Sequence, residues 1–364
     1  MIEPTEFIRE NLKDLQPYPT RDLEGVADPV FLDANENALG DGVVNRYPDP
    51  VHNELCERVG QREGVSSDSI VFGNGSDELI DLIVRIFCEP KADAVVISSP
   101  TFGVYKISSQ LNNVECLDVP LTKSYQLNVD GILEVNYKAN VLFICNPNSP
   151  TGNRLEHGDV VELLEKWDGI VVVDEAYIEF STQVSFVDMV GRFPNLIVLR
   201  TFSKFWGMAG ARLGYAIADS VVIEFMRRAK PLYNVNNLSV VAVNKALDNE
   251  AQYIKNGQLV VKERSRLKDY FESKPFVQSV NQSDTNFLFV EFSCLVSDVF
   301  NHLKSGQIFV RDYQNYPNHL RITIGSESEN NLLIDVLDNF DPLPNSGPLL
   351  AGDSESKNLN EEGE

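Results

Sequence analysis

Short apolar runs rich in β-branched residues recur along this chain and constrain its fold more than any other feature. Each run is bounded by polar residues, glycine or proline, as is typical of strands buried on both faces. The runs are Ala94–Ser98, Val141–Cys145, Ile170–Asp174, Leu196–Arg200 and Leu213–Ala218. Segments with helical spacing of apolar residues, such as Asp77–Phe87 and Glu156–Trp167, lie between them. The alternation predicts an α/β domain with a mostly parallel sheet and right-handed crossovers.

A different pattern follows this region and predicts a second, smaller α+β domain. It consists of a helix over Asn249–Lys274, a strand over Phe287–Phe292, a helix over Val296–Lys304 and paired strands over Ile308–Arg311 and Leu320–Ile324. We therefore expect a large domain over residues 31–247 and a small domain over residues 248–341. Residues 1–30 are expected to form an arm that belongs to the small domain or packs on a partner subunit. The polar composition of residues 342–364 predicts a disordered acidic tail.

Charge and cysteine usage exclude several classes of function. The formal net charge of −23 disfavours nucleic acid as a partner, because a polyanion would be repelled. The N-terminal residues 1–10 lack the apolar core of a secretory signal, and the longest apolar runs are too short to cross a bilayer. The five cysteines form no CxxC pair, and the four histidines form no cluster with metal-ligand spacing. We expect a cytoplasmic protein without a metal site or a disulfide framework.

Two segments with candidate catalytic or binding residues lie at the ends of predicted strands. Asp174 ends one strand, and an acid at the carboxyl end of a parallel strand faces the crevice where α/β sheets bind ligands. Taken alone, such an aspartate is more often a helix cap or a solvated loop residue. The next strand leads into a loop with Ser203, Lys204 and Arg212. A lysine beside aromatic residues can stay nucleophilic and suits Schiff-base chemistry, although an ordinary solvated loop lysine explains it equally well.

Two further segments also lie at predicted strand ends. Residues 73–78, Gly-Asn-Gly-Ser-Asp-Glu, precede a helix whose first N–H groups can bind an anion, although a plain Ser76 cap is the simpler explanation. They match neither the dinucleotide fingerprint nor the Walker loop. Residues 146–152, Asn-Pro-Asn-Ser-Pro-Thr-Gly, alone would be an ordinary turn. An acid, a lysine, a phosphate cradle and a polar loop at one sheet edge together indicate pyridoxal phosphate.

These residues resemble those of the fold-type I pyridoxal-phosphate aminotransferases, and within them the histidinol-phosphate aminotransferases of the class II family. The resemblance covers about residues 10–340 and implies a large domain with a seven-stranded type of sheet, mostly parallel, and a smaller α+β C-terminal domain. Its general part is Asp174-Glu-Ala-Tyr177 followed by Ser203-x-Lys with Arg212, and its more specific part is Asn35-Glu-Asn and Asn45-Arg-Tyr-Pro. Further matches are residues 73–78, 100–103, 146–152, 212–215 and 320–325.

The resemblance implies a role for each matching residue. Lys204, Asp174 and Tyr177 would be catalytic: Lys204 holds the cofactor and moves the proton, Asp174 pairs with the ring nitrogen, and Tyr177 bonds the ring's phenolic oxygen. The residues that would bind the cofactor are Gly75, Ser76, Asp77, Phe102, Asn148, Ser149, Asp174, Tyr177, Thr201, Ser203, Lys204, Arg212 and, from the neighbouring subunit of a homodimer with shared sites, Tyr47. The residues that would contact substrate are Tyr18, Asn35, Arg311 and Arg321.

The implied reaction is transamination from histidinol phosphate to 2-oxoglutarate in histidine biosynthesis. One guanidinium, that of Arg321, can accept either a phosphate or a carboxylate in two parallel hydrogen bonds. The chain departs from the family at Ser149, where an asparagine is common, so the contact with the phenolic oxygen is open between Ser149 and Asn148. An aromatic or general amino-acid aminotransferase, a threonine-phosphate decarboxylase and a non-catalytic binding protein with the same fold remain alternatives.

Overall fold

The computed structural model describes residues 3–341 except residues 20, 22–28 and 314–315. The acidic tail expected over residues 342–364, and part of the N-terminal arm, lie outside the described residues. Among the described residues, no helix combines the length and the apolar character needed to cross a membrane.

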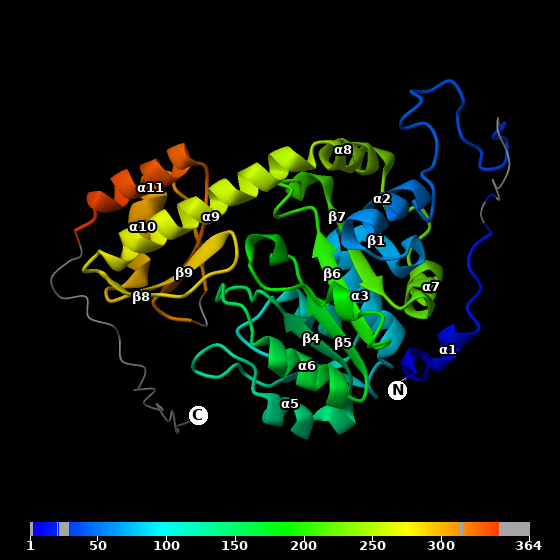
Figure 1. Ribbon diagram of the computed structural model, residues 1–364, viewed down its shortest axis with the longest axis horizontal. Helices are drawn as coiled ribbons and strands as arrows, with labels where there is room; N and C mark the ends of the chain where they lie inside the picture. Colours follow the sequence, from blue (N-terminus) through cyan, green and yellow to red (C-terminus); the bar gives the residue numbers. More distant parts are fainter. Residues whose placement is uncertain (1–2, 20, 22–28, 314–315, 342–364) are drawn as a thin grey trace, which may run out of the picture.

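A seven-stranded sheet forms the centre of the large domain (Figure 1). Its strands, in spatial order, are β1 (Ile70–Asn74), β7 (Leu213–Ala218), β6 (Leu196–Thr201), β5 (Ile170–Asp174), β4 (Ala139–Cys145), β2 (Ala94–Ile97) and β3 (Glu115–Asp118). β7 is antiparallel to both of its neighbours, whereas every other pair is parallel. The mostly parallel α/β sheet predicted from the apolar runs is therefore confirmed.

Helices cover both faces of this sheet, and each face has its own apolar core. On one face lie α3 (Gly75–Phe87), α4 (Val104–Leu111) and α7 (Ser220–Ala229). On the other lie α2 (Asn53–Glu63), α5 (Val129–Glu134), α6 (His157–Lys166) and α8 (Asn237–Asp248). The central strands are buried on both sides, which explains why they read as continuous apolar runs rather than as alternating ones.

The small domain is a four-stranded antiparallel sheet covered by helices. Its strand order is β10 (Arg311–Asp312), β11 (His319–Thr323), β9 (Phe287–Phe292) and β8 (Val277–Val280). Its helices are α9 (Glu250–Glu272), α10 (Val296–Ser305) and α11 (Glu327–Asp338). Figure 1 shows α9 running from the end of α8 above the large sheet into the small domain. The domain division that we propose at residues 247 and 248 falls at the end of α8.

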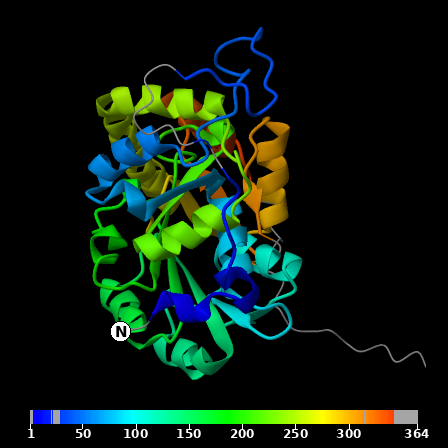
Figure 2. The ribbon, with the colours of Figure 1, turned by 90° about the vertical axis from the view of Figure 1, so that its right-hand side faces the viewer.

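Two expectations about these outer parts need correction. The strand expected over Ile308–Arg311 pairs only at β10, because Ile308 and Val310 pack on the apolar core without joining the ladder. The N-terminal arm was expected on the small domain or a partner, but Ile8 is buried in the core of the large domain. The following helix, α1 (Glu10–Lys13), lies at the foot of the large domain in Figures 1 and 2.

The remaining elements are single 3₁₀ turns. They are η1 (Pro4–Phe7), η2 (Ser67–Ser69), η3 (Asn136–Lys138), η4 (Ile178–Phe180), η5 (Phe186–Met189) and η6 (Ala209–Ala211). Two of them, η4 and η6, lie in the loops that leave β5 and precede β7, next to the carboxyl edge of the sheet.

Candidate active site

A cavity opens at the carboxyl edge of the parallel strands, where four of the expected segments meet. β5 ends at Asp174, β4 at Cys145 and β6 at Thr201, and α3 begins at Gly75 directly after β1. The residues that line the cavity are Ser76, Asp77, Phe102, Cys145, Asp174, Ala176, Tyr177, Thr201, Ser203, Lys204 and Arg212. The structure thus brings together nine of the thirteen residues expected to hold a cofactor, although they are far apart in sequence.

Asp174 supplies a buried carboxylate to this cavity. Its Oδ2 accepts a hydrogen bond from the Tyr105 hydroxyl at 2.8 Å, and its Oδ1 accepts one from the Ala176 N–H at 3.1 Å. Burial raises the pKa of Asp174 to about 6, while the two hydrogen bonds oppose that rise. The group is therefore mainly ionised at neutral pH and can accept a further hydrogen bond from a protonated ring nitrogen.

Lys204 provides the amine. Burial, followed by the nearby charge of Arg321, lowers the pKa of Lys204 below its usual value. Its Nζ lies 5.5 Å from the centre of the Tyr177 ring. A lysine whose neutral form is favoured in this way is a nucleophile and a base.

An anion cradle lies at the start of α3. The first N–H groups of a helix have no partner within the helix and attract negative charge. Gly75 has a φ of +74°, and a Cβ there would lie 2.4 Å from Nη2 of Arg212. A Cβ at Gly214 would lie 2.5 Å from the Ser76 nitrogen. Gly75 thus leaves the room in which Arg212 approaches the helix terminus, where it pairs with Asp77 at 2.9 Å, and Gly214 lets β7 lie close against the start of α3.

Thr201 and Phe102 shape the rest of the cavity. The Thr201 hydroxyl accepts a hydrogen bond from the Ser203 N–H at 3.1 Å and so fixes the turn that carries Ser203 and Lys204. Phe102 is half-buried, and its ring meets the Tyr105 ring edge to face at 5.6 Å. Thr201 therefore has a clear role in the loop itself, while Phe102 offers an aromatic wall.

The geometry distinguishes Ser149 from Asn148. The Asn148 side-chain amide is used within the protein: it donates to the Pro100 carbonyl at 2.8 Å and to the Thr151 hydroxyl at 2.7 Å. The Ser149 hydroxyl instead accepts a hydrogen bond from Nη1 of Arg321 at 3.0 Å. Ser149 is therefore the residue of this loop that is directed toward the groups around the cavity.

Arg321 approaches the site from β11 of the small domain. Its guanidinium lies over the Phe287 ring at 5.1 Å. Its buried Nε has no hydrogen-bond partner among the residues that the structure describes. A buried guanidinium N–H without a partner is costly, so it is suited to an anionic ligand.

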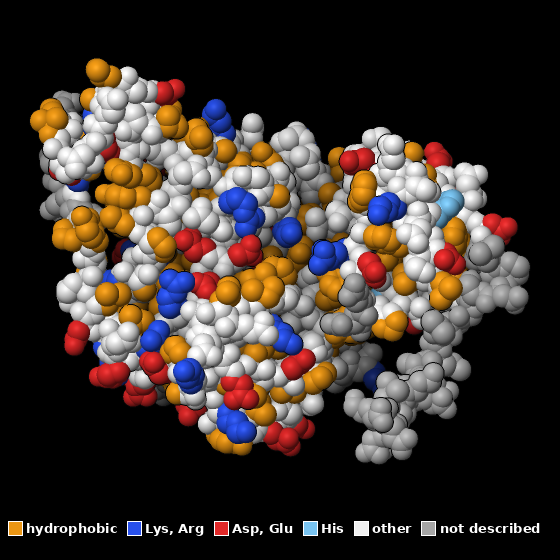
Figure 3. All heavy atoms as spheres, turned by 180° about the vertical axis from the view of Figure 1, so that it is seen from behind, with side chains coloured by type: hydrophobic (Ala, Val, Ile, Leu, Met, Phe, Trp, Pro, Cys, Tyr) orange, Lys and Arg blue, Asp and Glu red, His pale blue; other side chains and the backbone are white. Residues whose placement is uncertain are grey.

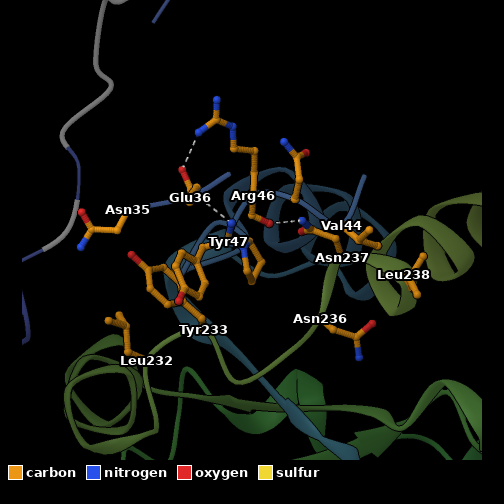
Figure 4. Close-up of a pocket in the computed structure, with 12 residues that line it drawn as sticks. Asn35, Glu36, Val44, Arg46, Tyr47, Leu232, Tyr233, Asn236, Asn237 and Leu238 are labelled. Carbon is orange, nitrogen blue, oxygen red and sulfur yellow. Dashed lines mark hydrogen bonds and ion pairs between the residues drawn. The ribbon is translucent and has the colours of Figure 1, made fainter. Parts of the chain in front are cut away.

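Eight expected residues are not among those that line the cavity of this chain. Four of them, Gly75, Asn148, Ser149 and Arg321, have been described above, and the other four lie elsewhere. Asn35 and Tyr47 line a surface pocket, where the Tyr47 ring stacks on Tyr233 at 4.6 Å (Figure 4). Tyr18 lies in an adjoining pocket with both of them. Arg311 is exposed on β10, directly opposite Arg321 in the ladder.

The surface pocket is the larger of the two, with a volume of about 610 Å³ against about 120 Å³ beside Lys204. Its charged residues Glu36 and Arg46 are paired with each other at 3.0 Å, as Figure 4 shows. The smaller cavity contains the buried carboxylate and the amine with a lowered pKa. Perturbed titratable groups are a better sign of chemistry than size, so we place the active site there.

The sequence did not reveal two groups next to the site. Tyr105 donates to Asp174 from 69 positions away. The only signal for it was its place three residues after Phe102, which puts both on the same side of a helix start. The second is Arg200, which is buried beside Glu175 and makes an ion pair with it at 2.9 Å.

Known proteins match this chain over most of its length. The model of the family described as Aminotransferase class I and II matches residues 18–337. The histidinol-phosphate aminotransferase of Parabacteroides distasonis is 41% identical over 345 residues, 93% of this chain and 99% of that protein. The histidinol-phosphate aminotransferase of Cytophaga hutchinsonii is 39% identical over 342 residues, 92% and 98% respectively.

A solved structure supports the fold. It is the histidinol-phosphate aminotransferase from Sinorhizobium meliloti in complex with pyridoxal-5'-phosphate, which superposes with a TM-score of 0.74 at 24% identity. The match covers 80% of this chain and 82% of that chain.

Proposed function

Because this chain belongs to the aminotransferase class I and II family, we propose that it transfers an amino group from histidinol phosphate to 2-oxoglutarate. The reaction type is supported by one observation: Lys204, Asp174 and an anion cradle line the same cavity. The choice of donor is supported by the names of the relatives, which are histidinol-phosphate aminotransferases at 36–41% identity. The fold is that of the fold-type I enzymes, as expected.

The cofactor is pyridoxal phosphate, and the residues of the cavity fit it. The start of α3, which Arg212 approaches over Gly75, suits a phosphate group, which Ser76, Asp77 and Ser203 would also hold. When bound, pyridoxal phosphate supplies a conjugated ring that takes up the electrons of a bond broken at the substrate carbon bearing the amine. Asp174 would keep the ring nitrogen protonated.

The other side chains that line the cavity would position the pyridine ring of the cofactor. Phe102 would stack on its face, and the Tyr177 hydroxyl would donate to its phenolic oxygen. Burial raises the pKa of Tyr177, so this hydroxyl stays protonated and remains a donor at neutral pH. Ser149 would share that contact, since its hydroxyl lies within the same group of side chains as Tyr177 and Arg321.

Lys204 would move the proton. With its pKa lowered by burial, Nζ of Lys204 can accept a proton from the amine-bearing carbon and return it to the cofactor side. The anionic end of the substrate would be held by Arg321, whose Nη1 is fixed by Ser149. Because both substrates are anions, one guanidinium serves the phosphate of the donor and a carboxylate of the acceptor. Arg311, Tyr18 and Asn35 would complete the substrate contacts.

Replacing Arg321 by alanine should lower kcat/KM for histidinol phosphate by about 100-fold or more, because a bidentate charged hydrogen bond to the substrate is lost. The loss should appear mainly as a higher KM, and it should affect 2-oxoglutarate as well. Steady-state kinetics with each substrate in turn provide the measurement. The control is Arg192→Ala, which removes an exposed arginine of the large domain. Unchanged kinetics for both substrates would rule out Arg321 as their anchor.

We also propose a homodimer in which Tyr47 reaches the cofactor of the partner. Tyr47 is about half exposed and does not line the cavity of its own chain. Around it, the N-terminal segment exposes Leu32 and Leu39, and Figure 3 shows hydrophobic side chains gathered at its upper left, on this part of the surface. Exposed apolar patches of this kind mark interfaces. Sedimentation equilibrium checks the proposal, and a monomer at micromolar concentration would contradict it.

A single-turnover experiment tests the function. The protein is loaded with pyridoxal phosphate, histidinol phosphate is added without a keto acid, and the visible absorbance of the bound cofactor is followed. Loss of that absorbance faster than with phenylalanine or tyrosine supports the proposal. Conversion with the aromatic amino acids alone would retain the chemistry and change the substrate. Release of carbon dioxide from threonine phosphate would instead identify the lyase, and a protein without cofactor absorbance would rule out the cofactor assignment and the role of Lys204.

A further inference from the structure

Tyr105 lies directly behind the cavity and contacts two of its walls. Its side chain on α4 is fully buried, and its hydroxyl donates to Oδ2 of Asp174 at 2.8 Å. One face of its ring stacks on Phe143 of β4 at 4.8 Å with an interplanar angle of 8°. Its ring also meets the edge of Phe102. These two ring contacts and complete burial hold the phenol against the carboxylate.

We propose that Tyr105 is a positioning residue that keeps the Asp174 carboxylate ionised and directed at the ring nitrogen of the cofactor. The inference rests on the proposed function, because the task that it assigns to Tyr105 concerns the bound cofactor, although Tyr105 does not touch the cofactor itself. It also links the aromatic wall to the carboxylate, because the same ring supports Phe102.

The hydrogen bonds around Asp174 show why this contact matters. Among the described residues, the carboxylate accepts from one side chain, Tyr105, and from one backbone group, the Ala176 N–H. Burial has already raised the pKa of Asp174 to about 6. The pKa of Tyr105 is raised well above its usual value, chiefly by burial, so its hydroxyl keeps its proton and acts only as a donor here. Removal of this donor would favour the neutral carboxyl group at neutral pH.

The other groups around the carboxylate do not replace this donor. The titratable groups that face Asp174 are Cys145 from β4, Asp77 from α3, Lys204 from the loop after β6 and Tyr177 from the loop after β5. Asp77 raises the pKa of Asp174 and Lys204 lowers it, both less than the hydrogen bonds do. Burial raises the pKa of the Cys145 thiol to about 12, so it adds no charge at neutral pH.

Tyr105→Phe tests the proposal, because it removes one hydroxyl and leaves the packed ring. The matched control is Tyr215→Phe, which removes an equally buried hydroxyl that donates to a different carboxylate, Glu63, at 2.7 Å. The dissociation constant of pyridoxal phosphate from the apoprotein is measured between pH 5 and pH 9 by fluorescence titration. Urea unfolding of each apoprotein reports separately on stability.

The expected result is a shift of the pH dependence. In the parent protein, affinity falls as the pH drops through the pKa of Asp174, since the neutral carboxyl no longer pairs with the protonated ring. In Tyr105→Phe this fall should begin about one pH unit higher, giving roughly threefold weaker binding at pH 6.5, approaching tenfold at pH 5, and near-parent binding at pH 8.5. Titration of the cofactor itself is common to all three proteins, so only the difference between them is interpreted.

Two results would overturn the inference. One is a Tyr105→Phe protein with the parent's pH dependence of binding, and the other is an equal shift in Tyr215→Phe. An apoprotein that binds no pyridoxal phosphate at any pH would overturn the proposed function instead, and the inference with it. A change in unfolding free energy without a shifted pH dependence would show that Tyr105 has a structural role alone.

Discussion

Lys204→Ala should lower kcat by at least about a thousandfold. The residue has two tasks that no neighbour can take over: its amine holds the cofactor, and it moves the proton at the substrate carbon. General acid–base catalysis alone typically contributes between about 10² and 10⁴ in rate. Turnover of histidinol phosphate with 2-oxoglutarate, followed by glutamate formation, is the measurement.

The matched control is Lys166→Ala, because Lys166 lies exposed on α6 and, among the described residues, pairs only with Glu162. The Lys204→Ala protein should still bind pyridoxal phosphate, since the phosphate cradle around Arg212 and the Asp174 carboxylate do not depend on the lysine. Circular dichroism should show an unchanged fold. A variant with near-parent kcat would refute the role of Lys204, and with it the proposed reaction.

The sequence was informative where chemistry follows directly after a strand. Asp174 and the turn that carries Lys204 each come directly after an apolar run, and the carboxyl ends of parallel strands meet at one edge of a sheet. Four local patterns therefore converged on one cavity without any knowledge of long-range contacts. The segment before α3 was recognisable for the same reason, because glycines before a helix start leave its first N–H groups accessible.

Contacts between distant parts of the chain were beyond such patterns. Nothing local shows that the Tyr105 hydroxyl points at Asp174, or that Asn148 is used by Pro100 while Ser149 is free to meet Arg321. The strand expected at Ile308 is apolar for another reason, namely packing on the small-domain core. Apolar character reports burial, and the choice between a ladder and a packed loop depends on neighbours that the local sequence does not specify.

Arg200 is the clearest case of a group that looked unremarkable in sequence. As the penultimate residue of β6 it is almost fully buried, and its Nε donates to Glu175 at 2.9 Å. Glu179 and Glu63 lie 3.4 Å and 3.6 Å away from the same guanidinium. Glu175 directly follows Asp174, and Arg200 precedes the turn that carries Lys204. The ion pair therefore ties together the two loops on which the catalytic groups lie.

Replacing Arg200 by methionine should destabilise the fold by about 3–5 kcal/mol, because buried carboxylates lose their partner. Burial, opposed by Arg200, already raises the pKa of Glu175 and of Glu179. Without Arg200 both pKa values rise further. A carboxyl group with a raised pKa in the folded state binds more protons there than in the unfolded state, so stability falls as the pH rises from about 4.5 upward.

The loss of stability in Arg200→Met should therefore be larger at pH 8 than at pH 5, which urea unfolding at both pH values can measure. Arg192→Met is the control, since Arg192 makes an exposed ion pair with Glu165 that should contribute less than about 1 kcal/mol. A pH-independent loss would mean that Glu175 and Glu179 do not titrate in the variant, and that packing rather than charge accounts for the role of Arg200. A loss below about 1 kcal/mol at both pH values would show that the buried network does not hold the two catalytic loops together.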